Sequence, residues 1–167
     1  MNRALSCVHP HAYFYVSKRP LATDWALVSE PASVPVTLGD GSTLYLGATQ
    51  SFRMRRDKGQ WRVTTEEYIY NVGELEQTRD YMLAWHWHPN QRPECHMHVK
   101  AEPSGPIKFD GKHLPTSRVS FEEVLRFLIT ECDVQPVEAE WHAMLEETQG
   151  LFEQFRSWMG SRKPGRG

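Results

Sequence analysis

Four of the eight histidines in this 167-residue chain form two His-x-His pairs that a short loop separates. The pairs are His86/His88 and His96/His98, and residues 89–94 connect them. Side chains two residues apart on a β-strand share one face of the sheet. If both pairs lie on strands joined as a hairpin, all four imidazoles therefore lie on one surface. The other face then carries an apolar layer of Trp85, Trp87, Cys95 and Met97.

Imidazoles gathered on one surface can act as the acid and base of a proton-transfer reaction. The ordinary pKa of histidine, about 6.5, lets one imidazole accept a proton while another donates one at neutral pH. RNA supplies its own nucleophile in the 2′-hydroxyl, so its cleavage requires a base, an acid and cations near the phosphate. We therefore predict a metal-independent endoribonuclease with His86 or His88 as base and His96 or His98 as acid.

The phosphate of such a substrate needs positively charged or hydrogen-bonding partners. Lys100 follows His98 at strand spacing, and His113 and Arg118 precede a predicted helix. An arginine can hold a phosphate through two parallel hydrogen bonds. A helix that begins near Phe121 would add an anion-attracting N-terminus. We therefore predict substrate binding by Lys100, His113 and Arg118.

Metal binding by the same four histidines is the second hypothesis. Imidazoles at positions i and i+2 of a strand are close enough to reach one ion. Three histidines with an open position suit catalytic zinc, whereas an added carboxylate such as that of Glu94 suits iron or manganese. The sequence thus leaves two possibilities open: an enzyme without a cofactor, and a small metal-dependent enzyme.

A non-enzymatic function is the third hypothesis. Paired imidazoles across a hairpin can be purely structural. In that case an aromatic surface would bind a partner, and the chain would be an interaction module of a defence or regulatory locus. The residues proposed for that surface are Tyr68, Tyr70, Trp85 and Trp87.

The first two thirds of the chain have the pattern of an antiparallel meander. Short aromatic or β-branched runs alternate with turn signals such as Gly39-Asp40-Gly41-Ser42 and Asp57-Lys58-Gly59. Eight candidate runs lie at residues 13–17, 25–28, 34–38, 43–46, 51–56, 61–70, 78–88 and 96–100, and we predict that they form a sheet of about six to seven strands.

Helical spacing replaces this pattern after residue 106. Ser120 and Glu123 form a capping box, and apolar residues recur behind it at helical spacing until about Cys132. A second helix is predicted from about Glu138, with an apolar stripe that runs from Trp141 to Trp158. The prediction is an α+β fold in which two C-terminal helices pack on the sheet. Residues 1–159 would form one domain and residues 160–167 a flexible basic tail.

Composition limits the classes of partner and compartment. The formal charge is −2, from 19 Lys and Arg against 21 Asp and Glu, so RNA binding must depend on a local surface. No stretch approaches the ~20 apolar residues of a membrane span, and the N-terminus lacks a signal-peptide core. Three scattered cysteines without a Cys-x-x-Cys motif disfavour a disulfide framework. We predict a cytoplasmic protein with no membrane partner.

Three runs of the sequence resemble segments of a group of uncharacterised bacterial proteins and, more distantly, of TumE-like toxins from bacterial toxin–antitoxin pairs. They are Tyr81-Met82-Leu83-Ala84-Trp85-His86-Trp87-His88-Pro89, Cys95-His96-Met97-His98-Val99 and His113-Leu114-Pro115-Thr116-Ser117-Arg118-Val119-Ser120. The resemblance spans about residues 61–158. It implies a growth-inhibiting protein that acts on RNA or translation and is neutralised by a cognate antitoxin, for which a helix-turn-helix protein is a candidate. By position, the resemblance also implies that His86, His88, His96 and His98 belong to the functional site.

Overall fold

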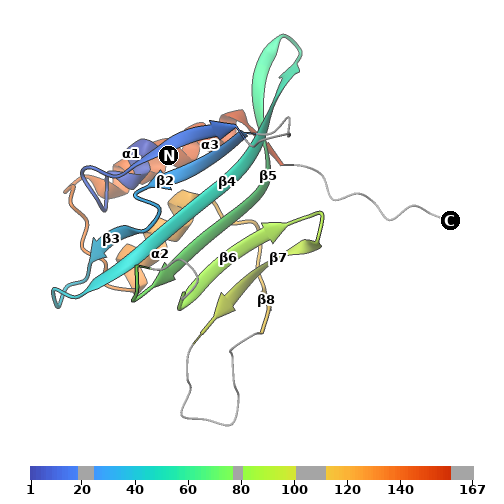
Figure 1. The fold of residues 1–167 in the computed structure, drawn as a ribbon. Coiled ribbons are helices and arrows are strands. Elements are labelled where there is room, and N and C mark those ends of the chain that lie inside the picture. The colour runs from blue at the N-terminus through green and yellow to red at the C-terminus, as the bar shows by residue number, and fades with distance from the viewer. Residues whose placement is uncertain (19–24, 77–80, 101–111, 159–167) are drawn as a thin grey trace.

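The computed structural model describes residues 1–18, 25–76, 81–100 and 112–158. One mixed sheet dominates the fold, with strands in the order β1-β2-β4-β5-β6-β7-β8; β3 pairs with β4, and β9 pairs with β5 (Figure 1). All pairings are antiparallel except that of β9 with β5. The strands are β1 (Tyr13–Lys18), β2 (Trp25–Glu30), β3 (Val34–Thr37), β4 (Thr43–Asp57), β5 (Gln60–Gly73), β6 (Leu83–His88), β7 (Arg92–Val99), β8 (Leu114–Pro115) and β9 (Arg156–Trp158).

Within the described residues three helices accompany the sheet: α1 (Asn2–Leu5), α2 (Phe121–Glu131) and α3 (Trp141–Phe155). The predicted α+β class, with two C-terminal helices packed on an antiparallel sheet, is confirmed. None of the described helices is long and apolar enough to span a membrane. The tail predicted over residues 160–167 lies outside the described residues, as do residues 78–80 of the predicted strand at 78–88.

The longest strand corrects the sequence prediction. The runs at 43–46 and 51–56 belong to one continuous strand, β4, because the residues between them pair with β5 on one side and partly with β2 on the other. Ala48 and Gln50 in that interval are buried, so tertiary pairing overrides their weak strand signal. A register shift between Ser51 and Phe52 leaves Glu66 of β5 as the extra residue between their two partners, Thr65 and Glu67.

The predicted start of α2 is confirmed in detail. The Ser120 side chain accepts a hydrogen bond from the Glu123 amide at 3.2 Å, and the Glu123 carboxylate accepts one from the Ser120 amide at 2.6 Å. The second helix differs from its prediction at both ends, since α3 begins at Trp141 and ends at Phe155. Trp158, expected on its stripe, therefore lies in β9.

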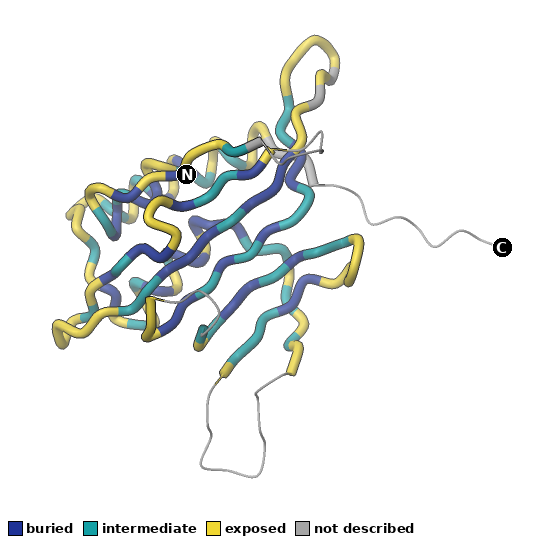
Figure 2. Tube along the Cα trace, viewed as in Figure 1, coloured by how far each residue is buried: buried dark blue, intermediate teal, exposed yellow. Residues whose placement is uncertain are grey.

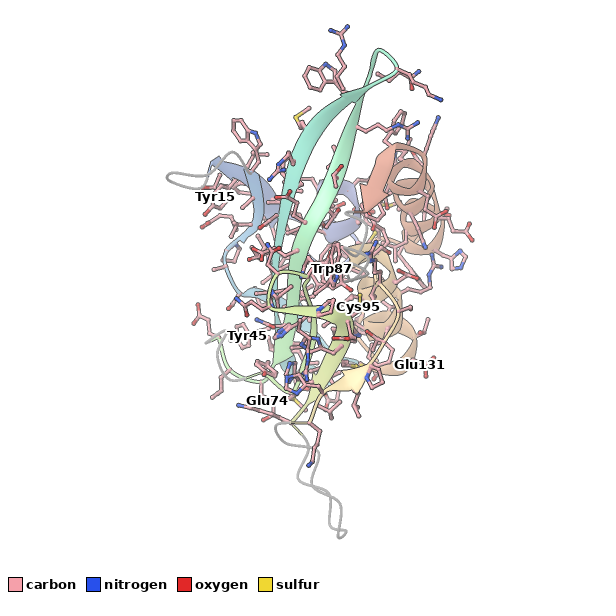
Figure 3. All side chains as sticks on the ribbon, turned by 90° about the vertical axis from the view of Figure 1, so that its right-hand side faces the viewer. Tyr15, Tyr45, Glu74, Trp87, Cys95 and Glu131 are labelled. Carbon is pink, nitrogen blue, oxygen red and sulfur yellow. The ribbon has the colours of Figure 1, made fainter. Side chains whose placement is uncertain are left out.

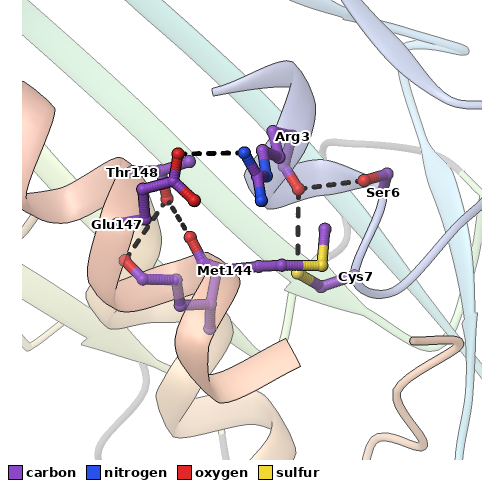
Figure 4. Close-up of polar contacts among 7 residues, drawn as sticks. Arg3, Ser6, Cys7, Met144, Glu147 and Thr148 are labelled. Atoms are coloured by element: carbon purple, nitrogen blue, oxygen red, sulfur yellow. Dashed lines mark hydrogen bonds and ion pairs between the residues drawn. The ribbon is translucent and has the colours of Figure 1, made fainter. Parts of the chain in front are cut away.

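Helix α1 was not anticipated, and it packs against α3. Arg3 forms an ion pair with Glu147 at 2.9 Å (Figure 4). In the same turn, the Ser6 hydroxyl and the Cys7 thiol both donate to the carbonyl of Arg3, at 2.9 and 3.7 Å. The other two cysteines, Cys95 and Cys132, are free like Cys7.

The core lies between the sheet and the helices (Figure 2). The four aromatic side chains proposed as a binding surface are 1–6% exposed and belong to this core: Tyr68, Tyr70, Trp85 and Trp87. They are buried because their strand parity turns them towards Phe121 and the other apolar residues of α2. They cannot form a partner-binding surface, and that part of the third hypothesis is wrong.

Candidate metal centre

The β6–β7 hairpin gathers the histidines on the sheet face opposite the helices. His86 pairs directly with His96 across the hairpin, and His98 follows two residues along β7. The His86 ring centroid lies 5.7 Å from that of His96 and 4.8 Å from that of His98. Trp87, between His86 and His88, and Cys95, which directly precedes His96, are buried in the core (Figure 3). The predicted alternation of imidazoles and apolar residues is therefore present.

His88 lies beside this group because the hairpin is irregular. The register shifts between His86 and His88, so that His88 pairs with Arg92, and β7 begins within the predicted loop. The His88 ring centroid is 5.3 Å from that of His86 and 6.4 Å from that of His96. Its Nδ1 atom is 3.9 Å from the Glu67 carboxylate. His88 thus borders the cluster and has its own acidic neighbour.

Three of the histidines can converge on one point. Ligand nitrogens of His86, His96 and His98, here called the histidine trio, all lie within 4.8 Å of one another. Some point then lies within about 2.8 Å of all three nitrogens, compared with zinc–nitrogen bonds of about 2.0–2.1 Å. Side-chain adjustments of less than about 1 Å would therefore bring the three nitrogens to bonding distance.

Neighbouring acceptors orient two members of the trio. The Nδ1 atom of His96 is 3.0 Å from the backbone carbonyl oxygen of Glu94. An Nδ1–H donor there leaves the Nε2 lone pair free for a ligand bond, an arrangement common among metal-binding histidines. The Nε2 atom of His86 is 3.4 Å from the Asn71 side-chain oxygen, and donation there leaves Nδ1 as the free lone pair. Glu94, predicted as a possible carboxylate ligand, thus contributes its main chain, and its side chain is not a member of the trio.

His113 joins the cluster, as predicted. It immediately precedes β8, which pairs with β7 at His96 and Met97. The His113 ring centroid lies 4.9 Å from that of His96 and 4.5 Å from that of His98. Its exposure places this imidazole at the rim of the cluster.

Lys100 also lies at the periphery of the cluster. Its ammonium is 5.2 Å from the Tyr81 ring centroid. That ring centroid is in turn 6.0 Å from those of His86 and His98. Lys100 is therefore linked to the trio through an aromatic side chain.

Arg118 and the α2 N-terminus, both predicted to bind phosphate, do not join the histidines on this face, and their predicted roles stay predictions. The Arg118 guanidinium lies 4.2 Å from the ring centroid of Trp87, whose indole is on the core face. The α2 N-terminus is satisfied by its own capping box, and its first turn carries two carboxylates, Glu122 and Glu123. Sequence proximity to His113 suggested a common site, but the chain passes from the open face to the helix layer between residues 113 and 118.

Burial favours the neutral form of several imidazoles in the cluster. Burial first, and then the positive charges that neighbouring histidines would carry, lower the pKa of His86 from 6.5 to about 3. Burial also lowers the pKa of His88 and His98 below the ordinary value. A general acid needs its proton near neutral pH, so His98 is poorly matched to its predicted role as acid.

Four residues near the cluster were not anticipated: Glu67, Asn71, Tyr81 and Arg92. Arg92 was assigned to the loop, although its pairing with His88 follows once the hairpin turn is shortened to three residues. Glu67 and Asn71 lie on β5, whose alternation places them on the face opposite Tyr68 and Tyr70. That alternation was visible in the sequence, but the pairing of β5 with β6 was required to place these two side chains beside the histidines.

Comparison with known proteins finds no match for the chain among family profiles, curated proteins or solved structures. The resemblance to TumE-like toxins remains a prediction.

Proposed function

We propose that this protein is a metal-dependent hydrolase that holds one transition-metal ion, preferably zinc, on His86, His96 and His98. The observation that carries the proposal is the convergence of three ligand nitrogens within 4.8 Å of one another. Three neutral imidazoles with an open fourth position are the donor set of several catalytic zinc sites. Iron and manganese sites more often include a carboxylate, which the trio lacks.

The position of the trio favours catalytic over structural metal. The trio lies on the face of the sheet that the helices leave uncovered, and two of its members, His86 and His98, are only partly buried. His96 is 5% exposed, but its two partly exposed neighbours leave the trio within reach of solvent, which would complete the ligand set of a bound ion. When bound, zinc lowers the pKa of a coordinated water to about 7 and so supplies a nucleophile at neutral pH. The protein orients the imidazoles through the Glu94 carbonyl and the Asn71 side chain.

Metal stoichiometry tests the proposal. The purified protein is incubated with zinc, iron(II) or manganese(II), separated from free ions and analysed by mass spectrometry. We expect about one zinc per chain for the wild type and at least a tenfold loss of zinc affinity for His86→Ala and His98→Ala. His142→Ala is the matched control, because His142 is an exposed histidine on α3 outside the cluster, beside its helix neighbours Trp141, with ring centroids 5.4 Å apart, and Glu146, at 3.7 Å.

Hydrolysis is measured with the same proteins. Activated esters and phosphodiesters serve as substrates, with and without a chelator that removes the ion. Loss of activity on chelation and its recovery on addition of zinc are the expected results. Wild-type protein that binds no metal, or trio variants that retain it at the wild-type level, would contradict the proposal.

Metal-independent cleavage of RNA is the second candidate. The observation in its favour is that two further imidazoles, those of His88 and His113, adjoin the trio on the same accessible cluster. They can provide a base and an acid without belonging to the metal site. Cleavage of RNA that persists in the presence of a chelator and is lost in His88→Ala and His113→Ala would favour this candidate over the first.

The toxin function predicted from the resemblance is compatible with either chemistry. Growth of bacteria that express the wild type or the His96→Ala/His98→Ala variant tests it, and only the wild type is expected to inhibit growth. An antitoxin partner would then be sought by co-purification.

A further inference from the structure

A small cavity adjoins the histidine trio on the side of the sheet edge. It has a volume of about 250 Å³ and lies between the start of β7 and the segment that leads into β8. We call it the Arg92 cavity; its lining residues are Arg92, Glu94, Cys95, His96, His113 and Pro115. His96 belongs to both the trio and the cavity wall, so a molecule in the cavity lies next to the proposed metal position.

We propose that the Arg92 cavity binds the phosphoryl group of the substrate, which would be a phosphate ester. This inference rests on the proposed hydrolase function, which it deepens by naming the class of substrate. The cavity provides donors from two walls: the Arg92 guanidinium from β7 and the His113 imidazole from the segment before β8.

Arg92 is suited to recognise an oxyanion. Its guanidinium presents paired N–H donors that match two oxygens of a phosphate. It lines the cavity together with His96 and His113, so its charge lies beside the cluster. Among the described residues, no carboxylate forms an ion pair with Arg92 within 4.0 Å. The charge of Arg92 is thus available for a ligand.

The number of potential partners favours phosphate over carboxylate. Arg92, His113 and the trio member His96 all line the cavity. A phosphoryl group has enough oxygens to contact all three, whereas a carboxylate has two. Glu94 adds one negative charge to the lining, so its removal is expected to strengthen anion binding.

The size of the cavity limits what it can hold. Sites that enclose drug-sized ligands have volumes of about 300–1,000 Å³. At about 250 Å³ the Arg92 cavity fits a head group, and the rest of the ester would extend along the open face.

Calorimetric titration with inorganic phosphate tests the inference on protein whose zinc content is measured in parallel. We expect Arg92→Gln to weaken phosphate binding at least tenfold, and Glu94→Gln to preserve or strengthen it. Arg56→Gln is the matched control, because Arg56 is an exposed arginine near the far tip of β4 and is expected to bind phosphate like the wild type. Zinc content should be unchanged in all three variants.

The outcomes separate this inference from the proposed function. Zinc-loaded protein whose phosphate affinity is unaffected by Arg92→Gln overturns the phosphoryl site and leaves the metal centre standing. Acetate that binds as tightly as phosphate also overturns it. Protein that binds phosphate through Arg92 but never binds zinc overturns the metal centre and supports the anion site.

Discussion

Trp87 and His88 are neighbours in the chain whose side chains have opposite environments, and a pair of alanine substitutions measures the difference. The Trp87 side chain is 1% exposed and packs 6.1 Å from Tyr68 between ring centroids, with Arg118 stacked on it at 4.2 Å. Truncation of a buried tryptophan to alanine costs about 3–5 kcal/mol. In a chain of 167 residues each kcal/mol lowers the melting temperature by about 2–4 °C. Trp87→Ala should therefore melt about 6–20 °C below the wild type.

His88→Ala should have a much smaller effect. His88 is partly exposed, and its 3.9 Å contact with the Glu67 carboxylate should be no stronger than a surface ion pair, because burial lowers the pKa of the imidazole. Such pairs contribute at most about 1 kcal/mol, so the expected fall in melting temperature is no more than about 4 °C.

Thermal unfolding followed by circular dichroism, with urea unfolding as a second measurement, compares the two variants. Trp87→Phe is included because it retains an aromatic ring and should fold even if the alanine variant does not. Equal destabilisation by Trp87→Ala and His88→Ala would refute the assignment of faces. The histidine trio would then lose its basis, because a shift of one residue sends every side chain of a strand to the other face.

Three further predictions concern the metal and the helix layer. Zinc at a hundredfold excess over its dissociation constant should stabilise the folded chain by about 2.7 kcal/mol and raise the melting temperature by about 5–11 °C. A wild type whose melting temperature does not change with zinc, or a His98→Ala variant that shifts equally, would contradict this prediction. Ser120→Ala removes the hydrogen bond to the Glu123 amide and should cost about 1 kcal/mol in urea unfolding, whereas Ser120→Asp should restore most of it. Burial raises the pKa of Glu122 above 4.5, so the folded state favours the protonated carboxyl. The contribution of this group to the free energy of unfolding is therefore fully present below pH 4.5 and is lost as pH rises through the folded-state pKa. The stability of Glu122→Gln relative to the wild type should therefore increase with pH above 4.5, and the exposed Glu146→Gln should show no such trend.

Strands with alternating residue types and helices with a capping box were predictable from sequence. Side chains alternate between the two faces of a strand, and this alternation placed the imidazoles and the apolar layer of β6 and β7 on the correct faces. The start of α2 followed from Ser120 and Glu123, because the capping box is a local interaction between residues three apart. Both signals involve only neighbours in sequence, which is why they could be recognised without coordinates.

Features that depend on distant pairing could not be predicted. The continuity of β4 through Ala48 and Gln50 comes from strands on both sides of it. Arg118 was assigned to the histidine face because it is close to His113 in sequence, although the chain crosses to the other side of the sheet before reaching it. The neighbours of the trio on β5, Glu67 and Asn71, required the knowledge that β5 pairs with β6.

The outer strand next to the histidines also limits how larger molecules can be recognised there. β8 consists of Leu114 and Pro115, and the proline has no N–H to offer an incoming strand. An extended peptide or a second copy of the chain therefore has little main chain with which to continue the sheet at this edge. A molecule that approaches this edge must therefore be recognised by side chains and not by main-chain hydrogen bonds. A single-stranded nucleic acid or a small ester can be recognised in this way more readily than a β-strand can.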